Sequence, residues 1–164
     1  MQNFIDQKIS LEEPGLRYVL EEDPNFEFKS VTGVISNYFE PFVKHDVANR
    51  LVTTSPKYMG KDPNELIANW DAARDYGTKV HNEIEDYIIH DKYPKEQKAI
   101  KGIEWLDKHT FLEKHKLYSE KIIYSTELKI AGSVDLIIKN VQNNEYTIID
   151  WKTNDKINTR SYDK

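Results

Sequence analysis

Two segments near the end of the chain place charged side chains inside apolar, strand-like sequence. In YTIIDWKT, the alternation of a strand puts Asp150 and Lys152 on one face, about 6.5 Å apart along the chain. In AGSVDLIIKN, Asp135 interrupts an apolar run shortly after Gly132. Charged groups in such positions are unfavourable unless they are paired or used. The sequence therefore offers two acids and one lysine that could act together.

Each motif also has a purely structural interpretation. Asp150 and Lys152 could form a surface ion pair at a strand end, and Asp135 could cap a bulge at Gly132. If a hairpin aligns the two strands, however, Asp135 lies beside Asp150. Neighbouring carboxylates repel each other unless a proton or a divalent cation neutralises them. A shared cation with a lysine alongside is the chemistry that this arrangement would support.

A third candidate lies on the longest predicted helix, in YGTKVHNEIEDYI. His81 belongs to the apolar stripe that also holds Gly77 and Ile84, so its imidazole is expected to face inward. Gly77 would let this helix approach a neighbouring backbone closely. Glu85 follows one turn later, within about 40° of His81 on the helical wheel. An inward histidine is more often a hydrogen-bonded core residue, but beside two strand carboxylates it becomes a candidate metal ligand.

Composition narrows the choice of metal and of compartment. The chain has no cysteine, which excludes disulfides, thiolate zinc sites and cysteine nucleophiles. The remaining oxygen-rich ligands favour Mg²⁺ or Mn²⁺. The net charge of −5 argues mildly against nonspecific DNA coating, although metal-binding acids contribute to it. Without a membrane-length apolar run or a secretory signal, the protein is expected to stay in the cytoplasm where it is made, with no membrane partner.

Helical periodicity predicts the elements that carry His81. A long helix should run from Pro63 to Ile89 with Asp62 as its N-cap, followed by a second helix over residues 95–108. The apolar stripe of the long helix consists of Leu66, Trp70, Ala73, Gly77, Val80, Ile84 and Ile88. The inner face of the second helix consists of Ala99, Ile100, Ile103 and Leu106.

The segments before and after these helices have other patterns. Residues 1–30 should be irregular with short extended pieces, and residues 31–51 should form short helices broken at Pro41, with Ser30 or Thr32 as a cap. Residues 118–126, 128–139 and 145–152 are strand-like, and residues 142–144 form a polar turn, which predicts a three-strand meander. We expect one α+β domain, with residues 1–61 as a lead-in and residues 62–164 as its core.

GTKVHNEIE, GSVDLI and IIDWKT, in this order, resemble the RecB-like exonuclease branch of the PD-(D/E)XK nuclease superfamily. That branch includes the mitochondrial genome-maintenance exonuclease and many phage exonucleases. SVTGVIS at residues 30–36 and the W-x-x-A-x-x-x-G-T run at residues 70–78 extend the resemblance over about residues 29–163. The residue before Asp135 is Val134 rather than the proline of the superfamily name.

The resemblance implies a restriction-endonuclease-like core in which N-terminal helices pack on a small mixed sheet. In relatives, the strand that carries the D-x-K motif (Asp150 to Lys152 in this chain) is followed by a helix and a further strand. These two elements are expected to be missing from a chain that stops at TRSYDK. The implied metal ligands are His81, Asp135, Asp150 and the backbone carbonyl of Trp151. The implied catalytic residues are Asp135, Asp150 and Lys152, and the accessory residues are Glu120, Glu85 and Thr153.

The resemblance also implies a reaction and a substrate. A divalent ion held by the two acids would activate water and polarise a phosphate oxygen, while Lys152 positions that water and offsets negative charge. We expect a DNA exonuclease of recombination, repair or phage DNA metabolism, with a helicase, polymerase or annealing protein as a partner. A non-cleaving nucleic-acid-binding module on the same fold is the alternative. The candidate DNA-contacting residues are Arg74, Lys79, Lys129, Lys156 and Arg160, with Trp70 or Tyr76 stacking on unpaired bases.

Overall fold

Helices form the middle of the chain and strands its two ends, which confirms the predicted α+β class. The computed structural model describes residues 8–12, 17–110 and 113–154. Part of the irregular lead-in predicted for residues 1–30, and residues 155–164, lie outside these ranges. The helices are α1 (Val31–Ser36), α2 (Lys44–Thr54), α3 (Pro63–His90) and α4 (Gln97–His109). The strands are β1 (Ile9–Glu12), β2 (Arg17–Leu20), β3 (Lys29–Ser30), β4 (His115–Ser125), β5 (Ile130–Asn140) and β6 (Tyr146–Ile149).

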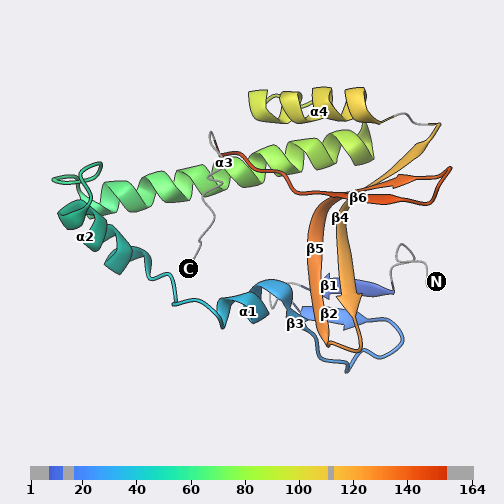
Figure 1. Cartoon of the computed structure of the whole chain (residues 1–164), viewed down its shortest axis with the longest axis horizontal. Coiled ribbons are helices and arrows are strands. Elements are labelled where there is room, and N and C mark those ends of the chain that lie inside the picture. The colour runs from blue at the N-terminus through green and yellow to red at the C-terminus, as the bar shows by residue number, and fades with distance from the viewer. Residues whose placement is uncertain (1–7, 13–16, 111–112, 155–164) are drawn as a thin grey trace.

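Strand β5 is the centre of a mixed sheet (Figure 1). It pairs with β4 along its whole length, and with β6 at its C-terminal end, in antiparallel fashion. These contacts confirm the predicted meander. The start of β5 also pairs in parallel with the short β3, which the sequence did not predict. Strands β1 and β2 form a separate antiparallel hairpin.

The last strand is shorter than predicted. The expected strand over residues 145–152 ends as β6 at Ile149, so Asp150 and Lys152 follow the strand instead of belonging to it. The backbone N–H of Trp151 donates to the carboxylate of Asp135, at 2.7 Å, rather than to a carbonyl of a neighbouring strand. The side chain of Asp135 therefore takes the place that a backbone carbonyl of the neighbouring strand would have. The chain leaves the sheet at this point.

Helix α3 begins and ends at residues that suit a helix terminus. The side chain of Asp62 accepts a hydrogen bond from the N–H of Asn64, and Pro63 fills the first turn, as predicted. The helix ends at Asp91, which adopts the left-handed conformation with φ of 54°. Of the predicted stripe, Leu66, Val80 and Ile84 are buried. Ala73 is exposed, so its place in the stripe was wrong: the sheet and α4 do not reach this part of α3.

The helices around α3 follow the predicted breaks. Ser30 caps α1 by accepting from the N–H of Gly33 at 3.0 Å, and the segment that contains Pro41 separates α1 from α2. Helix α2 packs on the first half of α3, where Lys44 forms an ion pair with Asp71. None of the described helices combines the length and the apolar character that a bilayer-spanning segment needs.

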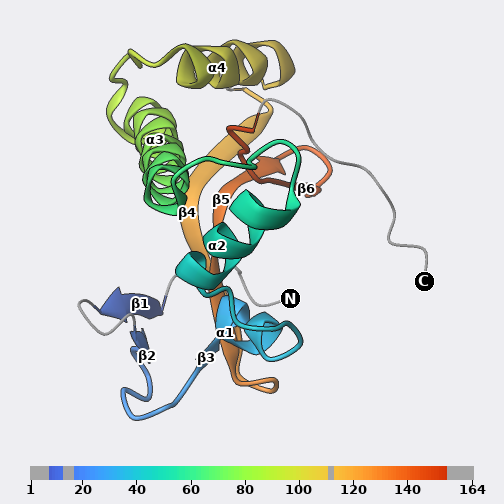
Figure 2. The ribbon, with the colours of Figure 1, turned by 90° about the vertical axis from the view of Figure 1, so that its left-hand side faces the viewer.

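Two apolar clusters lie at opposite ends of the β4–β5 ribbon (Figure 2). At one end, α3 and α4 cover the sheet, and their buried residues pack with Leu136 and Ile138 of β5. At the other end, the β1–β2 hairpin packs with Ala131 of β5. The middle of the ribbon, between these two clusters, is where β4 and β5 carry their acidic side chains.

Candidate metal centre

Three side chains from three elements converge at the middle of the ribbon. His81 comes from α3, Glu120 from β4 and Asp135 from β5. Each offers one ligand atom, and these atoms all lie within 4.8 Å of one another. The Nδ1 atom of His81 lies 3.5 Å from Oδ2 of Asp135, and the two side chains are only 27% and 19% exposed. We call these three residues the metal group.

The register of the hairpin explains why Glu120 belongs to this group. Ser119 pairs with Leu136 and Lys121 with Val134, so Glu120 lies opposite Asp135. Glu120 itself has a φ of 47°, in the left-handed region that non-glycine residues seldom adopt. A residue in this conformation interrupts the ladder and bends a strand, and the ribbon bends between the part beside β3 and the part beside β6 (Figure 1). The unfavourable backbone conformation of Glu120 therefore lies at the point where the three ligand atoms come together.

The carboxyl of Glu120 is in an unfavourable environment for a negative charge. Partial burial raises its pKa, and the neighbouring carboxylates of Asp135 and Glu85 raise it further, while His81 acts in the opposite direction. Glu120 as a whole residue is exposed, and the burial that raises its pKa concerns the side of the carboxyl that faces the metal group. A carboxyl with a raised pKa beside other acids fits a divalent cation, which would neutralise the group.

Asp135 is held by the segment that follows β6. Its Oδ2 atom accepts the hydrogen bond from the backbone N–H of Trp151. The Trp151 ring packs against the α3–α4 core and meets Trp105 edge to face, with ring centroids 6.2 Å apart. A large, half-buried side chain thus fixes the backbone that orients a candidate ligand.

Asp150 and Lys152 contact each other rather than the metal group. Lys152 Nζ lies 2.6 Å from Oδ2 of Asp150, and the two side chains are 59% and 60% exposed. Among the described residues, Asp150 is not part of the group whose ligand atoms could share an ion. Because Leu136 pairs with Ile149, the next step of the register places Asp150 opposite Asp135. The backbone therefore brings the two acids side by side as expected, while the Asp150 side chain points to Lys152.

The remaining accessory candidates surround this arrangement. Glu85 acts electrostatically on Glu120 but is not a member of the metal group. Thr153 lies against α3, because a Cβ atom added at Gly77 would be 3.3 Å from Thr153 Oγ1. A close approach was predicted at Gly77, but the atom that lies there is the side-chain hydroxyl of Thr153 rather than a neighbouring backbone atom.

The described DNA-contact candidates are already engaged with protein groups. Arg74 pairs with Asp71 at 3.0 Å and with Asp75 at 2.8 Å. Lys79 pairs with Glu96, and Lys129 lies 5.9 Å from the centroid of the Phe26 ring. Lys156 and Arg160 lie outside the described residues. The half-buried aromatic candidates also have neighbours: Trp70 meets Phe42, with centroids 5.7 Å apart, and Tyr76 packs on the α3–α4 core.

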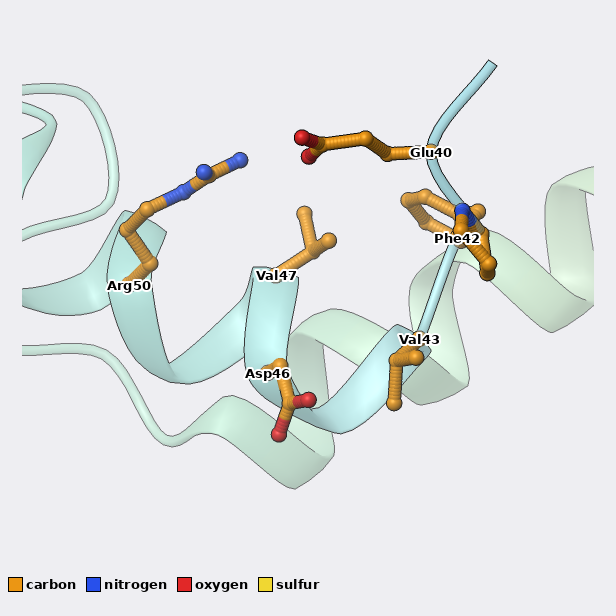
Figure 3. Close-up of a pocket in the computed structure, with 7 residues that line it drawn as sticks. Glu40, Phe42, Val43, Asp46, Val47 and Arg50 are labelled. Atoms are coloured by element: carbon orange, nitrogen blue, oxygen red, sulfur yellow. The ribbon is translucent and has the colours of Figure 1, made fainter. Parts of the chain in front are cut away.

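A separate shallow pocket is formed by α2 and the segment before it (Figure 3). Its lining comprises residues 40–43 together with Asp46, Val47 and Arg50. Glu40 and Arg50 extend toward each other across Val47 in this view (Figure 3). The pocket contains none of the residues predicted for the site, so the metal group is a distinct feature of the molecule.

Glu120, which the sequence predicted as an accessory residue, is a member of the metal group, and Lys98 was not among the predicted residues. Glu120 could have been found from the loop at residues 126–129, because a tight connection there aligns it with Asp135. Lys98 of α4 donates a hydrogen bond to the backbone carbonyl of Thr153, which lies 55 residues further along the chain. No local sequence signal announces such a contact, since it depends on how α4 lies on α3.

Comparison with known proteins gives one match. A model of the PD-(D/E)XK nuclease superfamily matches residues 43–163, which is well over half of the chain. No curated protein and no solved structure matched. The match includes α2, α3, α4, the β4–β5–β6 meander and every residue of the metal group. The family match and the α+β fold agree, and the chain belongs to the PD-(D/E)XK superfamily of metal-dependent nucleases.

Proposed function

We propose that this protein is a divalent-metal-dependent DNA exonuclease of the RecB-like branch. The observation that carries the proposal is the convergence of His81, Glu120 and Asp135 from three separate elements. Membership of the superfamily implies a nucleic-acid substrate and phosphodiester hydrolysis. The motif order along the chain supports the branch, and the branch in turn supports exonuclease activity in DNA recombination, repair or phage DNA metabolism. Residues 62–164 are proposed as the core, with residues 1–61 leading into it.

The donor set of the metal group suits a hard divalent cation. Two carboxylates and one imidazole favour Mg²⁺ or Mn²⁺ over softer metals, and the imidazole is a better ligand for Mn²⁺. Two ligands of one Mg²⁺, each about 2.1 Å from it, are at most about 4.2 Å apart. The observed upper limit of 4.8 Å therefore needs only a small contraction. We further propose that Asp150 and the Trp151 carbonyl complete the protein ligands.

A divalent cation bound by these residues would supply Lewis-acid activation of water and of a phosphate oxygen. The residues of this chain bind, orient and balance charge around that chemistry. Asp135, fixed by the N–H of Trp151, holds its carboxylate at the centre of the group. The ammonium of Lys152, which lies beside Asp150, would donate a hydrogen bond to a phosphate oxygen or to a water molecule. This role requires Lys152 to exchange Asp150 for substrate.

A non-cleaving nucleic-acid-binding module is the second candidate. The observation in its favour is that Asp150 and Lys152 neutralise each other outside the metal group. A protein in which this pair persisted would bind metal through the remaining residues without placing a lysine at the phosphate. The two functions differ in a single measurable property, which is hydrolysis of DNA.

The proposed substrate surface consists of basic side chains. Arg74, Lys79 and Lys129 would contact phosphates by exchanging their present protein partners for DNA, together with Lys156 and Arg160. A helicase, polymerase or annealing protein is the proposed kind of partner. Binding that depends steeply on salt, with a slope reduced in Arg74→Ala, would support the assignment of that residue.

The test uses linear and covalently closed DNA with Mg²⁺, Mn²⁺ or EDTA. We expect metal-dependent loss of linear DNA only, and a loss of about 100-fold or more in rate for Lys152→Ala. Lys108→Ala, which removes an exposed lysine at the end of α4, is the matched control and should retain the wild-type rate. Degradation of closed DNA would indicate an endonuclease. Binding without hydrolysis under every metal condition would favour the second candidate.

A further inference from the structure

A lysine of α4 contacts the segment that carries the D-x-K residues. The ammonium of Lys98 donates a hydrogen bond to the backbone carbonyl of Thr153, the residue immediately after Lys152. The same ammonium lies 5.9 Å from the centroid of the Tyr76 ring on α3. Lys98 is half-buried, so its charge is held between two helices and the end of the described chain.

This segment needs such contacts because it is no longer part of the sheet. After Ile149, the backbone is fixed on one side by the Trp151 N–H bonded to Asp135 and by the Trp151 ring in the core. On the other side, Thr153 lies against α3 at Gly77, and its carbonyl accepts the hydrogen bond from Lys98 of α4. Lys152 lies between these two attachment points, so both of them determine where its ammonium can reach.

We propose that Lys98 is a positioning residue that sets the place of Lys152 relative to the metal group. This inference rests on the proposed nuclease function. A hydrogen bond from a charged donor to a carbonyl is stronger than one between neutral groups, and here it spans α4 and the D-x-K segment. Lys98 does not touch the reacting atoms and acts through the backbone on either side of Thr153.

The chain offers clean variants for a test. Lys98→Met keeps an unbranched side chain of similar length but removes the ammonium that donates to Thr153 and faces the Tyr76 ring, whereas Lys98→Arg keeps a charged donor. Lys101→Met makes the same change at an exposed position of α4, one turn further on. Folding of each variant is checked by its thermal transition and circular dichroism.

Two readouts separate positioning from general stability. In Lys98→Met, kcat should fall by about tenfold to 100-fold, because a displacement of about 1 Å in a catalytic group has effects of that size. The KM for DNA and the affinity for Mn²⁺ should stay within about twofold of wild type, since the metal group is intact. In metal-free protein, the amide of Trp151 should exchange faster with deuterium. Lys98→Arg should recover most of the rate, and Lys101→Met should match wild type.

The outcomes distinguish this inference from the function on which it rests. If wild-type protein does not hydrolyse DNA, the proposed function fails, and the Trp151 exchange in metal-free protein still tests the attachment by Lys98. Unchanged kcat together with unchanged Trp151 exchange in Lys98→Met overturns the inference. A lowered melting temperature with unchanged kcat also overturns it, and so does a failure of Lys98→Arg to recover activity.

Discussion

Trp151 donates its backbone N–H to Oδ2 of Asp135 at a distance of 2.7 Å. This bond joins the segment that carries Asp150 and Lys152 to a member of the metal group. It also replaces a ladder contact, so the chain leaves the sheet where the chemistry would begin. The position of the D-x-K residues and the orientation of Asp135 are therefore coupled, so a substitution that changes one should also change the other.

Replacement of Asp135 by Asn should weaken metal binding and reduce hydrolysis. An amide can still accept from the Trp151 N–H, but it carries no charge to attract a cation. We expect Mn²⁺ affinity measured by calorimetry to fall by at least about tenfold, because a carboxylate ligand is lost. Glu113→Gln, which neutralises an exposed acid in the loop before β4, is the control and should bind Mn²⁺ as wild type does. Wild-type affinity in Asp135→Asn would exclude this residue as a ligand.

Replacement of Glu120 by Gln should raise the melting temperature of the metal-free protein at pH 7. Burial, with Asp135 and Glu85 next in effect, raises the folded-state pKa of Glu120, so its charged form opposes folding. At low pH, protonation of Glu120 stabilises the folded state, and this stabilisation is lost as the pH rises through the raised pKa. The difference between Glu120→Gln and wild type should therefore grow with pH. Melting curves from pH 4 to pH 8 without metal test this, and a variant less stable than wild type at pH 7 would contradict it.

Replacement of Gly77 by Ala should lower kcat while the protein stays folded. A methyl group at this position would lie 3.3 Å from Thr153 Oγ1, tighter than an ordinary van der Waals contact. Gly77→Ala gains up to about 1 kcal/mol of helix propensity, so the protein should remain folded while the D-x-K segment is displaced and kcat falls. Thr153→Ala removes the opposing hydroxyl, and the double variant should recover activity. Equal rates for wild type and Gly77→Ala would show that the contact is unimportant.

Much of this arrangement follows from local sequence. The cap at Asp62, the length of α3, the break around Pro41 and the β5–β6 meander depend on neighbouring residues, and the sequence predicted each of them. The end of β6 depends on a hydrogen bond between Trp151 and Asp135, sixteen residues apart. The left-handed backbone of Glu120 and the reach of Lys98 to Thr153 likewise depend on packing. Periodicity places a side chain on a face, but it does not say which partner that side chain selects.

The core around Leu136 should be sensitive to truncation. Leu136 is fully buried among residues of α3 and α4 and is the neighbour of Asp135. Leu136→Ala should lower the free energy of unfolding by about 2–5 kcal/mol, since it leaves a cavity in a packed cluster. Leu128→Ala is the control: this side chain is 67% exposed in the hairpin loop, and the change should stay within about 0.5 kcal/mol. Urea denaturation measures both, and similar values for the two variants would contradict the described packing.

Glu83 should stabilise the start of α4 through its charge. Its Oε2 atom accepts hydrogen bonds from the N–H groups of Lys95, at 2.8 Å, and Glu96, at 2.7 Å, which lowers its pKa, with the bond from Glu96 as the largest cause. A lowered pKa means that this stability is present above the unfolded-state pKa and is lost as the pH falls through the folded-state value. Glu83→Ala should lower the free energy of unfolding by about 1 kcal/mol at pH 7. The loss should shrink in acid, and a loss independent of pH would argue against a capping role.

The central claim is that His81, Glu120 and Asp135 bind one divalent cation. The most direct measurement is a crystal structure of the protein grown with Mn²⁺, with diffraction data collected to record the anomalous signal of manganese. The account predicts a single strong anomalous peak within coordination distance of one atom from each of these three side chains. A peak elsewhere, or none at these residues under conditions in which the protein hydrolyses DNA, would contradict it.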